Sequence, residues 1–398
     1  MKKNLIMTLC CLFAITAMYA QHIPTLEEAV YGGLIKTRGG GHVNWMKDGE
    51  HYSKMERNAE GGIDVMAYSA KDNSKEVLIP GSKLVNPETG KPIQVRSFTF
   101  SDDNQKVLIY TNTRQVWRYD TRGDYWVLNI QTGKLQQLGK ARPEATLMFA
   151  KFSPDGTRVA YVSENNIYVE TLADGKVVQL TTDGNEKIVN GTFDWVYEEE
   201  FATSRSFDFS ADSKMLAYIR YDESKVMNYD MPMYIPTNAG NHEYDDYKKP
   251  YSYKYPVAGA QNSTVTVHTF DIKSRVTRKL DLPIDSTYYI PRIEFTQDPD
   301  FLAVITLNRH QNQLDLFQAN PLSGICKRIL REESPEYINE PTYQQLTFYK
   351  NHFIMPSERD GYNHLYLYTI GGNLVKQLTK GQYDAKIEHF TEVFIEKY

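Results

Sequence analysis

The stretch Phe152-Ser153-Pro154-Asp155-Gly156, which leads into the apolar residues 158–162, decides the fold. An aromatic residue, a small polar residue and an Asp-containing turn stand there directly before a strand-forming segment. The same pattern returns at residues 98–103, 207–212 and 293–298. Repetition of one strand–turn–strand unit predicts an all-β protein in which each unit contributes one sheet.

Hairpins complete these units. Residues 125–138 hold two apolar runs around Gln131-Thr132-Gly133-Lys134, and residues 366–378 hold two more around Gly371-Gly372-Asn373. Gly and Asn supply the positive φ that tight hairpin turns require. The repeats follow one another at about 50 residues, which is the spacing of four-stranded propeller blades. We therefore expect a β-propeller over residues 46–381.

Two segments depart from this spacing. The interval between residues 209 and 295 is longer, and it contains a Tyr- and Pro-rich stretch at about 226–256 that we expect to be an inserted, extended arm. Before the propeller, the N-terminal segment 21–45 includes Thr-Leu-Glu-Glu-Ala-Val at residues 25–30. This run predicts a short helix with a capping box at its start.

Charge and cysteine content limit the classes of function. The 398 residues carry 50 acidic and 45 basic side chains, a net charge of −5, so nothing indicates a nucleic-acid surface or a polybasic membrane patch. Residues 1–20, with two lysines and then an apolar run, predict a secretory signal peptide that is too short for a membrane span. After cleavage Cys326 would be the one remaining cysteine, so the exported chain would have no internal disulfide. We expect a periplasmic or secreted protein that does not contact a membrane.

The run Asp194-Trp195-Val196-Tyr197-Glu198-Glu199-Glu200 places three consecutive carboxylates after an apolar stretch. Like charges resist burial unless a cation compensates them. Two carboxylates on a cavity wall suit a free α-amino group, because an ammonium offers three donors and carboxylates only accept. We expect Trp195 and Tyr197 to alternate on a strand, so that the following turn aims the carboxylates into the interior of the propeller. A solvent-exposed acidic turn is the alternative that the residues alone leave open.

Motifs for catalysis, metal binding and phosphate binding are absent from the printed sequence. It contains no Gly-x-Ser-x-Gly elbow, no zinc-ligand spacing and no phosphate-binding glycine loop. Arg38-Gly39-Gly40-Gly41-His42 is rich in glycine, but it follows no strand-then-helix pattern, and we expect a loop. We therefore expect no catalytic residues, no metal and no cofactor in these residues.

Four motifs in this order resemble the N-terminal propeller of the dipeptidyl peptidase IV family of serine exopeptidases: residues 115–119, 190–200, 220–224 and 357–366. The resemblance runs from about residue 25 to about residue 381. It implies a propeller, eight-bladed in the family, that precedes a C-terminal α/β-hydrolase domain with a Ser-Asp-His triad. For this chain we expect about seven blades in an unclosed ring, a divergent tail at 382–398, and no hydrolase domain.

The resemblance also implies roles for individual residues. Glu199 and Glu200 match the two glutamates that hold the free N-terminal ammonium of the substrate. Arg118 matches the arginine that polarises the substrate carbonyl and pairs with those glutamates. Glu198 is expected to be a structural neighbour. The implied reaction of the whole family protein is release of N-terminal Xaa-Pro or Xaa-Ala dipeptides.

Three further expectations concern the surroundings of this site. Tyr337 and Tyr343 are candidate aromatic residues at its rim. The arm at 226–256 resembles the extension through which family members form homodimers. The chain by itself is expected to have no peptidase activity, and a non-catalytic periplasmic propeller that binds peptides or a protein partner is the alternative function.

Overall fold

The computed structural model describes most of the chain, namely residues 25–31, 43–46, 48–116, 119–203, 205–232 and 251–387. The expected helix near the N-terminus is confirmed as α2 (Leu26–Val30). The Thr25 side chain accepts from the backbone N–H of Glu28 (3.2 Å), and the Glu28 carboxylate accepts from the backbone N–H of Thr25 (2.9 Å), which completes the capping box. The expected signal peptide, the glycine-rich loop at 38–42 and the centre of the arm lie outside the described residues.

The described residues form six antiparallel sheets of blade size, which follow one another along the chain. The first sheet contains β1 (Asn44–Trp45), β2 (His51–Arg57), β3 (Ile63–Ser69) and β4 (Lys75–Ile79), with the short 3-10 helix η1 (Gly81–Lys83) after it. The second contains β5 (Ser97–Phe100), β6 (Lys106–Val116), β7 (Tyr119–Asn129) and β8 (Leu135–Gln137). The third contains β9 (Met148–Phe152), β10 (Arg158–Ser163), β11 (Asn166–Thr171) and β12 (Val177–Gln179).

The remaining sheets contain the inserted elements. The fourth has five strands, β13 (Ile188–Asn190), β14 (Phe207–Phe209), β15 (Met215–Asp222), β18 (Thr264–Asp271) and β19 (Thr277–Lys279). The fifth contains β20 (Tyr289–Phe295), β21 (Leu302–Leu307), β22 (Gln313–Ala319) and β23 (Cys326–Glu333). The sixth contains β24 (Thr347–Tyr349), β25 (His352–Ser357), β26 (His364–Thr369) and β27 (Leu374–Gln377), and the helix α4 (Pro341–Gln344) precedes it.

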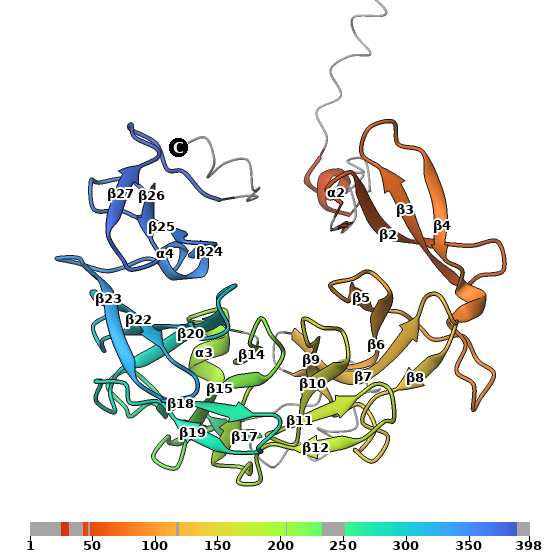
Figure 1. Ribbon diagram of the computed structural model, residues 1–398, viewed down its shortest axis with the longest axis horizontal. Helices are drawn as coiled ribbons and strands as arrows, with labels where there is room; N and C mark the ends of the chain where they lie inside the picture. The colour runs from red at the N-terminus through yellow and green to blue at the C-terminus, as the bar shows by residue number, and fades with distance from the viewer. Residues whose placement is uncertain are drawn as a thin grey trace, which may run out of the picture.

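The sheets stand side by side in an arc, as a propeller requires, and the arc does not close (Figure 1). The sheet β1–β4 lies at one end and the sheet β24–β27 at the other, and the two stand apart. The all-β propeller fold is therefore confirmed, with six sheets in the described residues where about seven were expected. The long interval at 209–295 accounts for part of the difference, because it supplies one sheet and an arm instead of a further blade.

Three of the four occurrences of the repeated sequence pattern correspond to one turn with the same hydrogen bonds, whereas at residues 293–298 the Thr296 hydroxyl bonds to the backbone of Asp298 instead. In the third sheet, the buried Ser153 hydroxyl donates to Asp155 (2.6 Å) and accepts from the backbone N–H of Arg158 (3.0 Å). Asp155 in turn accepts from the backbone N–H of Thr157 (3.0 Å). The second and fourth sheets repeat these bonds through Ser101 and Ser210. Such side-chain bonds to the backbone fix the turn from the first strand to the second.

Apolar residues between adjacent sheets form the core. The largest cluster joins the third to the sixth sheet, and two smaller clusters join the first sheet to the second and the second to the third. The beginning of the expected tail packs on the sixth sheet, where the Ala385 N–H donates to the Asn363 carbonyl (2.7 Å). Among the described residues, no helix has the length and apolar character needed to span a membrane.

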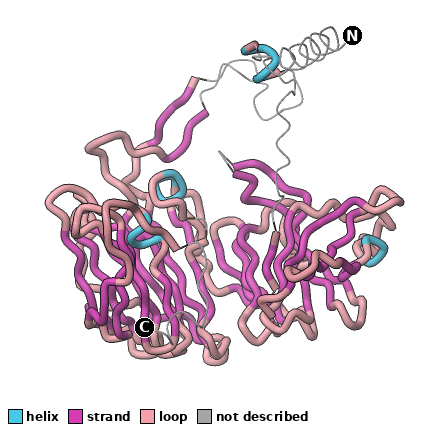
Figure 2. The backbone as a smooth tube through the Cα atoms, turned by 90° about the horizontal axis from the view of Figure 1, so that it is seen from above, coloured by secondary structure: helices cyan, strands magenta, loops and turns pink. Residues whose placement is uncertain are grey.

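The expected arm leaves the fourth sheet between β15 and β18. Its described ends, β16 (Asn228–Met231) and β17 (Tyr251–Lys254), pair antiparallel with each other and with no other described strand. Figure 2 shows this two-stranded ribbon projecting away from the sheets.

Candidate functional site

The acidic run lies on a helix that interrupts the first strand of the fourth sheet. Both β13 and β14 pair with β15, with Asn190 opposite Arg220 and Phe207 opposite Tyr218. The residues between them leave the sheet at Gly191, whose φ of 74° favours glycine, and form α3 (Trp195–Glu199). Figure 1 places α3 on the inner side of the arc, near β14 and β20.

The expectation of an alternating strand at Trp195 and Tyr197 was wrong. Asp194 is the N-cap of α3, and its side chain accepts from the backbone N–H of Tyr197 (2.9 Å). This bond satisfies one of the free N–H groups of the first turn, so the segment folds as a helix instead of extending. An Asp three residues before Tyr197, followed by helix-forming glutamates, was a signal in the sequence for this helix.

Buried contacts of Tyr197 fix α3 against the fourth and fifth sheets. Tyr197 is 1% exposed, and its hydroxyl accepts from the backbone N–H of Ile290 in the fifth sheet (2.9 Å). The Tyr197 ring contacts Tyr221 and Phe201, with centroid distances of 4.8 Å and 5.2 Å. Because these contacts come from two sheets, α3 is fixed at the junction between the fourth and fifth blades.

The three glutamates differ in accessibility. Glu198 is buried, Glu199 is half-buried and Glu200 is exposed. Consecutive helical residues point about 100° apart, so one short helix can turn one carboxylate inward and present the others. The side chain of Glu198 is thus enclosed by the protein, while those of Glu199 and Glu200 reach solvent to different extents; the roles expected for the three stay predictions.

The negative charge of Glu200 acts on both predicted aromatic residues. Burial raises the pKa of Tyr337, and the negative charges of Glu340 and Glu200 raise it further. Burial also raises the pKa of Tyr343, with Glu340, Tyr337 and Glu200 adding to the effect. Their role as the rim of a substrate site stays a prediction.

Helix α4 connects this aromatic pair to α3. The Phe201 and Tyr343 rings lie 6.1 Å apart, and the Gln344 side chain donates to the Phe201 carbonyl (3.3 Å). Tyr343 is 1% exposed, and its hydroxyl has no hydrogen-bond partner within the described part of the chain. A buried hydroxyl that forms no hydrogen bond is costly in free energy.

Two hollows adjoin these residues. One of about 340 Å³ is lined by Phe201, Thr203, Tyr343 and residues of the fourth and fifth sheets. The other, of about 480 Å³, is lined by Tyr337 and Thr342 together with charged residues that include Glu332 and Arg359. Helix α4 lines both hollows, with Thr342 in the larger one and with Tyr343 and Gln344 in the smaller one.

Arg118 lies outside the described residues. The strands on either side of it, β6 and β7, pair as far as Val116 and Tyr119. Its expected pairing with Glu199 and Glu200 stays a prediction. Within the residues that the structure describes, no group of three or more His, Cys, Asp or Glu side chains is arranged to hold a metal ion.

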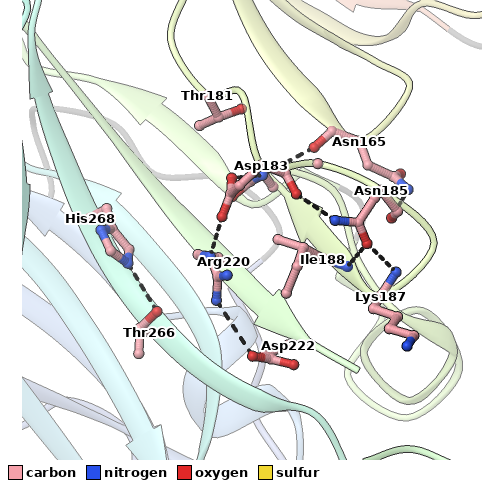
Figure 3. Close-up of polar contacts among 12 residues, drawn as sticks. Asn165, Thr181, Asp183, Asn185, Lys187, Ile188, Arg220, Asp222, Thr266 and His268 are labelled. Carbon is pink, nitrogen blue, oxygen red and sulfur yellow. Dashed lines mark hydrogen bonds and ion pairs between the residues drawn. The ribbon is translucent and has the colours of Figure 1, made fainter. Parts of the chain in front are cut away.

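The motif at residues 220–224 occupies a different place, the junction between the third and fourth sheets (Figure 3). Arg220 donates to Asp183 (2.8 Å) and lies 3.9 Å from Asp222. Nearby, Thr266 and His268 form a hydrogen bond of 3.0 Å. Burial and the positive charge of Arg220 lower the pKa of His268 to about 4. The Arg220–Asp183 pair links β15 to the connection between the third and fourth sheets.

Sequence reasoning missed the partner of the helix cap. The Ser263 hydroxyl donates to the second carboxylate oxygen of Asp194, and both residues are buried. Burial raises the pKa of Asp194, while the bonds from Ser263 and the backbone oppose this rise. The two residues are far apart in sequence, so no local pattern could have paired them.

A family model and a solved structure both match most of this chain. The family model described as "Dipeptidyl peptidase IV (DPP IV) N-terminal region" matches residues 101–394. The crystal structure of Porphyromonas gingivalis dipeptidyl peptidase 4 superposes with a TM-score of 0.81 and 34% sequence identity, over 92% of this chain and 50% of that chain.

Curated fungal proteins are similar over a shorter part of the chain. The "Probable dipeptidyl-aminopeptidase B" of Aspergillus clavatus is 30% identical over 258 residues, which are 64% of this chain and 27% of the fungal protein. Dipeptidyl-aminopeptidase B of Aspergillus niger is 28% identical over 273 residues, 66% of this chain and 30% of that protein. The chain thus spans less than a third of the length of these relatives.

Proposed function

The chain belongs to the dipeptidyl peptidase IV (DPP IV) N-terminal region family, and on this premise we propose that it is the substrate-gating propeller of a serine exopeptidase. The whole protein would release N-terminal Xaa-Pro or Xaa-Ala dipeptides. One observation carries the proposal. Glu199, which is half-buried, and Glu200, which is exposed, lie at the end of a capped helix, and the negative charge of Glu200 acts on Tyr337 and Tyr343.

The chemistry of the ammonium explains the restriction to chain ends. A free N-terminus donates three hydrogen bonds and carries a positive charge, and each charge-assisted bond contributes about 1.5–3 kcal/mol. An internal peptide bond offers neither. Glu199 and Glu200 would hold the ammonium, Arg118 would contact the substrate carbonyl, and Tyr337 and Tyr343 would line the rim.

Peptide binding to the purified chain tests this proposal. The tripeptide Ile-Pro-Ile is expected to bind at least tenfold more tightly than N-acetyl-Ile-Pro-Ile, measured by calorimetry or ligand-observed NMR. Glu199→Gln and Glu200→Gln should each reduce this preference, while Glu60→Gln, at an exposed glutamate of the first sheet, should not. Equal affinity for the two peptides would contradict the proposal.

We also propose that these residues supply binding and not bond cleavage, because they contain no Gly-x-Ser-x-Gly motif. The purified chain is expected to leave a Gly-Pro chromogenic amide intact. Turnover that a serine-directed phosphonate abolishes would show that a nucleophile is present.

We further propose that the protein is exported to the periplasm or the medium. The signal-like residues 1–20 support this location, and cell fractionation tests it.

We propose that the protein forms a homodimer through the arm, since the described strands of the arm expose Tyr229 and Met231. Tyr229→Asp should convert a defined dimer into monomer in sedimentation experiments.

A further inference from the structure

The segment that returns from the arm to the fourth sheet contacts α3 near its start. This return segment comprises residues 255–263, between β17 and β18. The Tyr255 ring lies 4.1 Å from the Trp195 ring, and the Ser263 hydroxyl donates to Asp194. Both contacted residues stand at the N-terminus of the helix that carries Glu199 and Glu200.

The bond from Ser263 controls the helix cap. One Asp194 oxygen accepts from the Tyr197 N–H, and the other accepts from Ser263. Asp194 is 5% exposed and Ser263 is 4% exposed, so water cannot readily replace a lost bond. Ser263 therefore fixes the orientation of the carboxylate that starts α3.

The same segment supports the far end of the helix through Tyr289. The Asn262 side chain donates to the Tyr289 hydroxyl (2.7 Å), and Arg309 links that hydroxyl (2.6 Å) to the Ala260 carbonyl (3.1 Å). The Tyr289 ring lies 5.1 Å from Phe201, the residue that follows Glu200. The return segment thus supports α3 on both sides of the glutamates.

A helix of five residues depends on such support. Isolated helices of this length are unstable in water, because nucleation is costly and few hydrogen bonds follow it. The direction of the Glu199 and Glu200 side chains therefore depends on contacts made at the ends of α3. The return segment supplies these contacts and is continuous with the projecting arm.

We propose that the return segment is a positioning element for Glu199 and Glu200, so that the arm tunes the affinity of the site for a peptide N-terminus. The proposal rests on the ammonium recognition proposed above. Ser263 and Tyr255 act through α3 and do not touch the peptide.

Four variants and one control test the proposal in the full chain. Ser263→Ala and Tyr255→Ala are expected to weaken binding of Ile-Pro-Ile about threefold to tenfold, the size expected for loss of a helix cap. Binding of N-acetyl-Ile-Pro-Ile should not change. Ser263→Thr and Tyr255→Phe keep the hydroxyl and the ring, and should retain the parent affinity. Gln261→Ala alters an exposed residue of the same segment and serves as the control.

The outcomes separate the two proposals. If the parent chain binds both peptides equally, ammonium recognition itself fails. If the parent prefers the free N-terminus and neither Ser263→Ala nor Tyr255→Ala reduces that preference, the positioning role alone is overturned. If Ser263→Ala does not fold, the test rests on Tyr255, which is half-buried: the affinities of Tyr255→Ala and Tyr255→Phe for Ile-Pro-Ile are then compared.

Discussion

The fold strongly changes the pKa of Glu223, a residue at the base of the arm. It is 7% exposed, and burial together with the charge of Asp194 raises its pKa to about 8, although Lys254 opposes the rise. Lys254 holds the arm through the Val226 carbonyl (2.8 Å). A proton on Glu223 near neutral pH therefore avoids a second buried negative charge beside Asp194.

The first prediction is a pH dependence of stability that Glu223 causes. The pKa of this group in the folded state, about 8, exceeds its ordinary value of 4.5, so its contribution to stability is complete below pH 4.5 and is lost as the pH rises through 8. Denaturant unfolding at pH 5, 6.5 and 8.5 should show the parent losing roughly 3–5 kcal/mol relative to Glu223→Gln. Glu186→Gln, at an exposed glutamate, should follow the parent. Parallel curves for parent and Glu223→Gln would contradict the prediction.

A second prediction concerns Tyr197. In Tyr197→Phe the buried N–H of Ile290 loses its acceptor, because the hydroxyl bond of 2.9 Å is removed where water has little access. The free energy of unfolding is expected to fall by about 1–3 kcal/mol. Tyr119→Phe, at a half-exposed tyrosine, should change it by less than about 0.5 kcal/mol. A neutral effect of Tyr197→Phe would mean that the bond does not stabilise α3.

At the scale of elements, the sequence was sufficient to predict the turns that are fixed by hydrogen bonds between neighbouring residues. The Ser153 and Asp155 pattern specifies its turn within six residues, so the sheets could be placed from the sequence alone. Helix α3 was predicted as a strand from the alternation of Trp195 and Tyr197, and the capping signal of Asp194 was not considered. The contact between Trp195 and Tyr255 depends on two segments separated by the arm, and no local rule predicts it. The glutamates themselves were identified through the family resemblance and not from charge alone.

The third prediction concerns the junction between the fifth and sixth sheets. Arg292 on β20 donates to the carbonyls of Tyr343, Gln344 and Leu346 at 2.8–3.0 Å, and it pairs with Glu294. Arg292→Lys keeps the charge but cannot reproduce several bonds from one planar guanidinium, so we expect a loss of about 1–3 kcal/mol in unfolding free energy. Arg278→Lys, at an exposed arginine of β19, should be neutral. Equal stability of the two variants would show that the carbonyl bonds do not hold the junction.

At the scale of the whole molecule, one face of the first sheet has no neighbouring blade among the residues that the structure describes (Figure 1). Side chains alternate across a strand, so Val65 packs toward the second sheet while Tyr68 lies on the other face. On that face Tyr52 stacks on Tyr68 at 5.2 Å, and Trp45, which is 54% exposed, contacts Tyr52 at 5.8 Å. Propellers avoid such exposed faces and edges by closing the ring.

The last prediction is that the chain self-associates through this aromatic face. Sedimentation velocity at increasing concentration should show species larger than a dimer, because Trp45 and the half-buried Tyr52 expose aromatic surface to water and such surface favours association. Trp45→Lys places a charge on the face and should reduce these species. Val177→Lys changes an exposed apolar residue on the outer strand of an interior sheet and should leave them unchanged. The dimer proposed for the arm differs in being defined in size and in depending on Tyr229. A monodisperse monomer with one sharp, cooperative thermal transition would show that the face is covered in solution, and the arc would then have to close in a way that Figure 1 does not show.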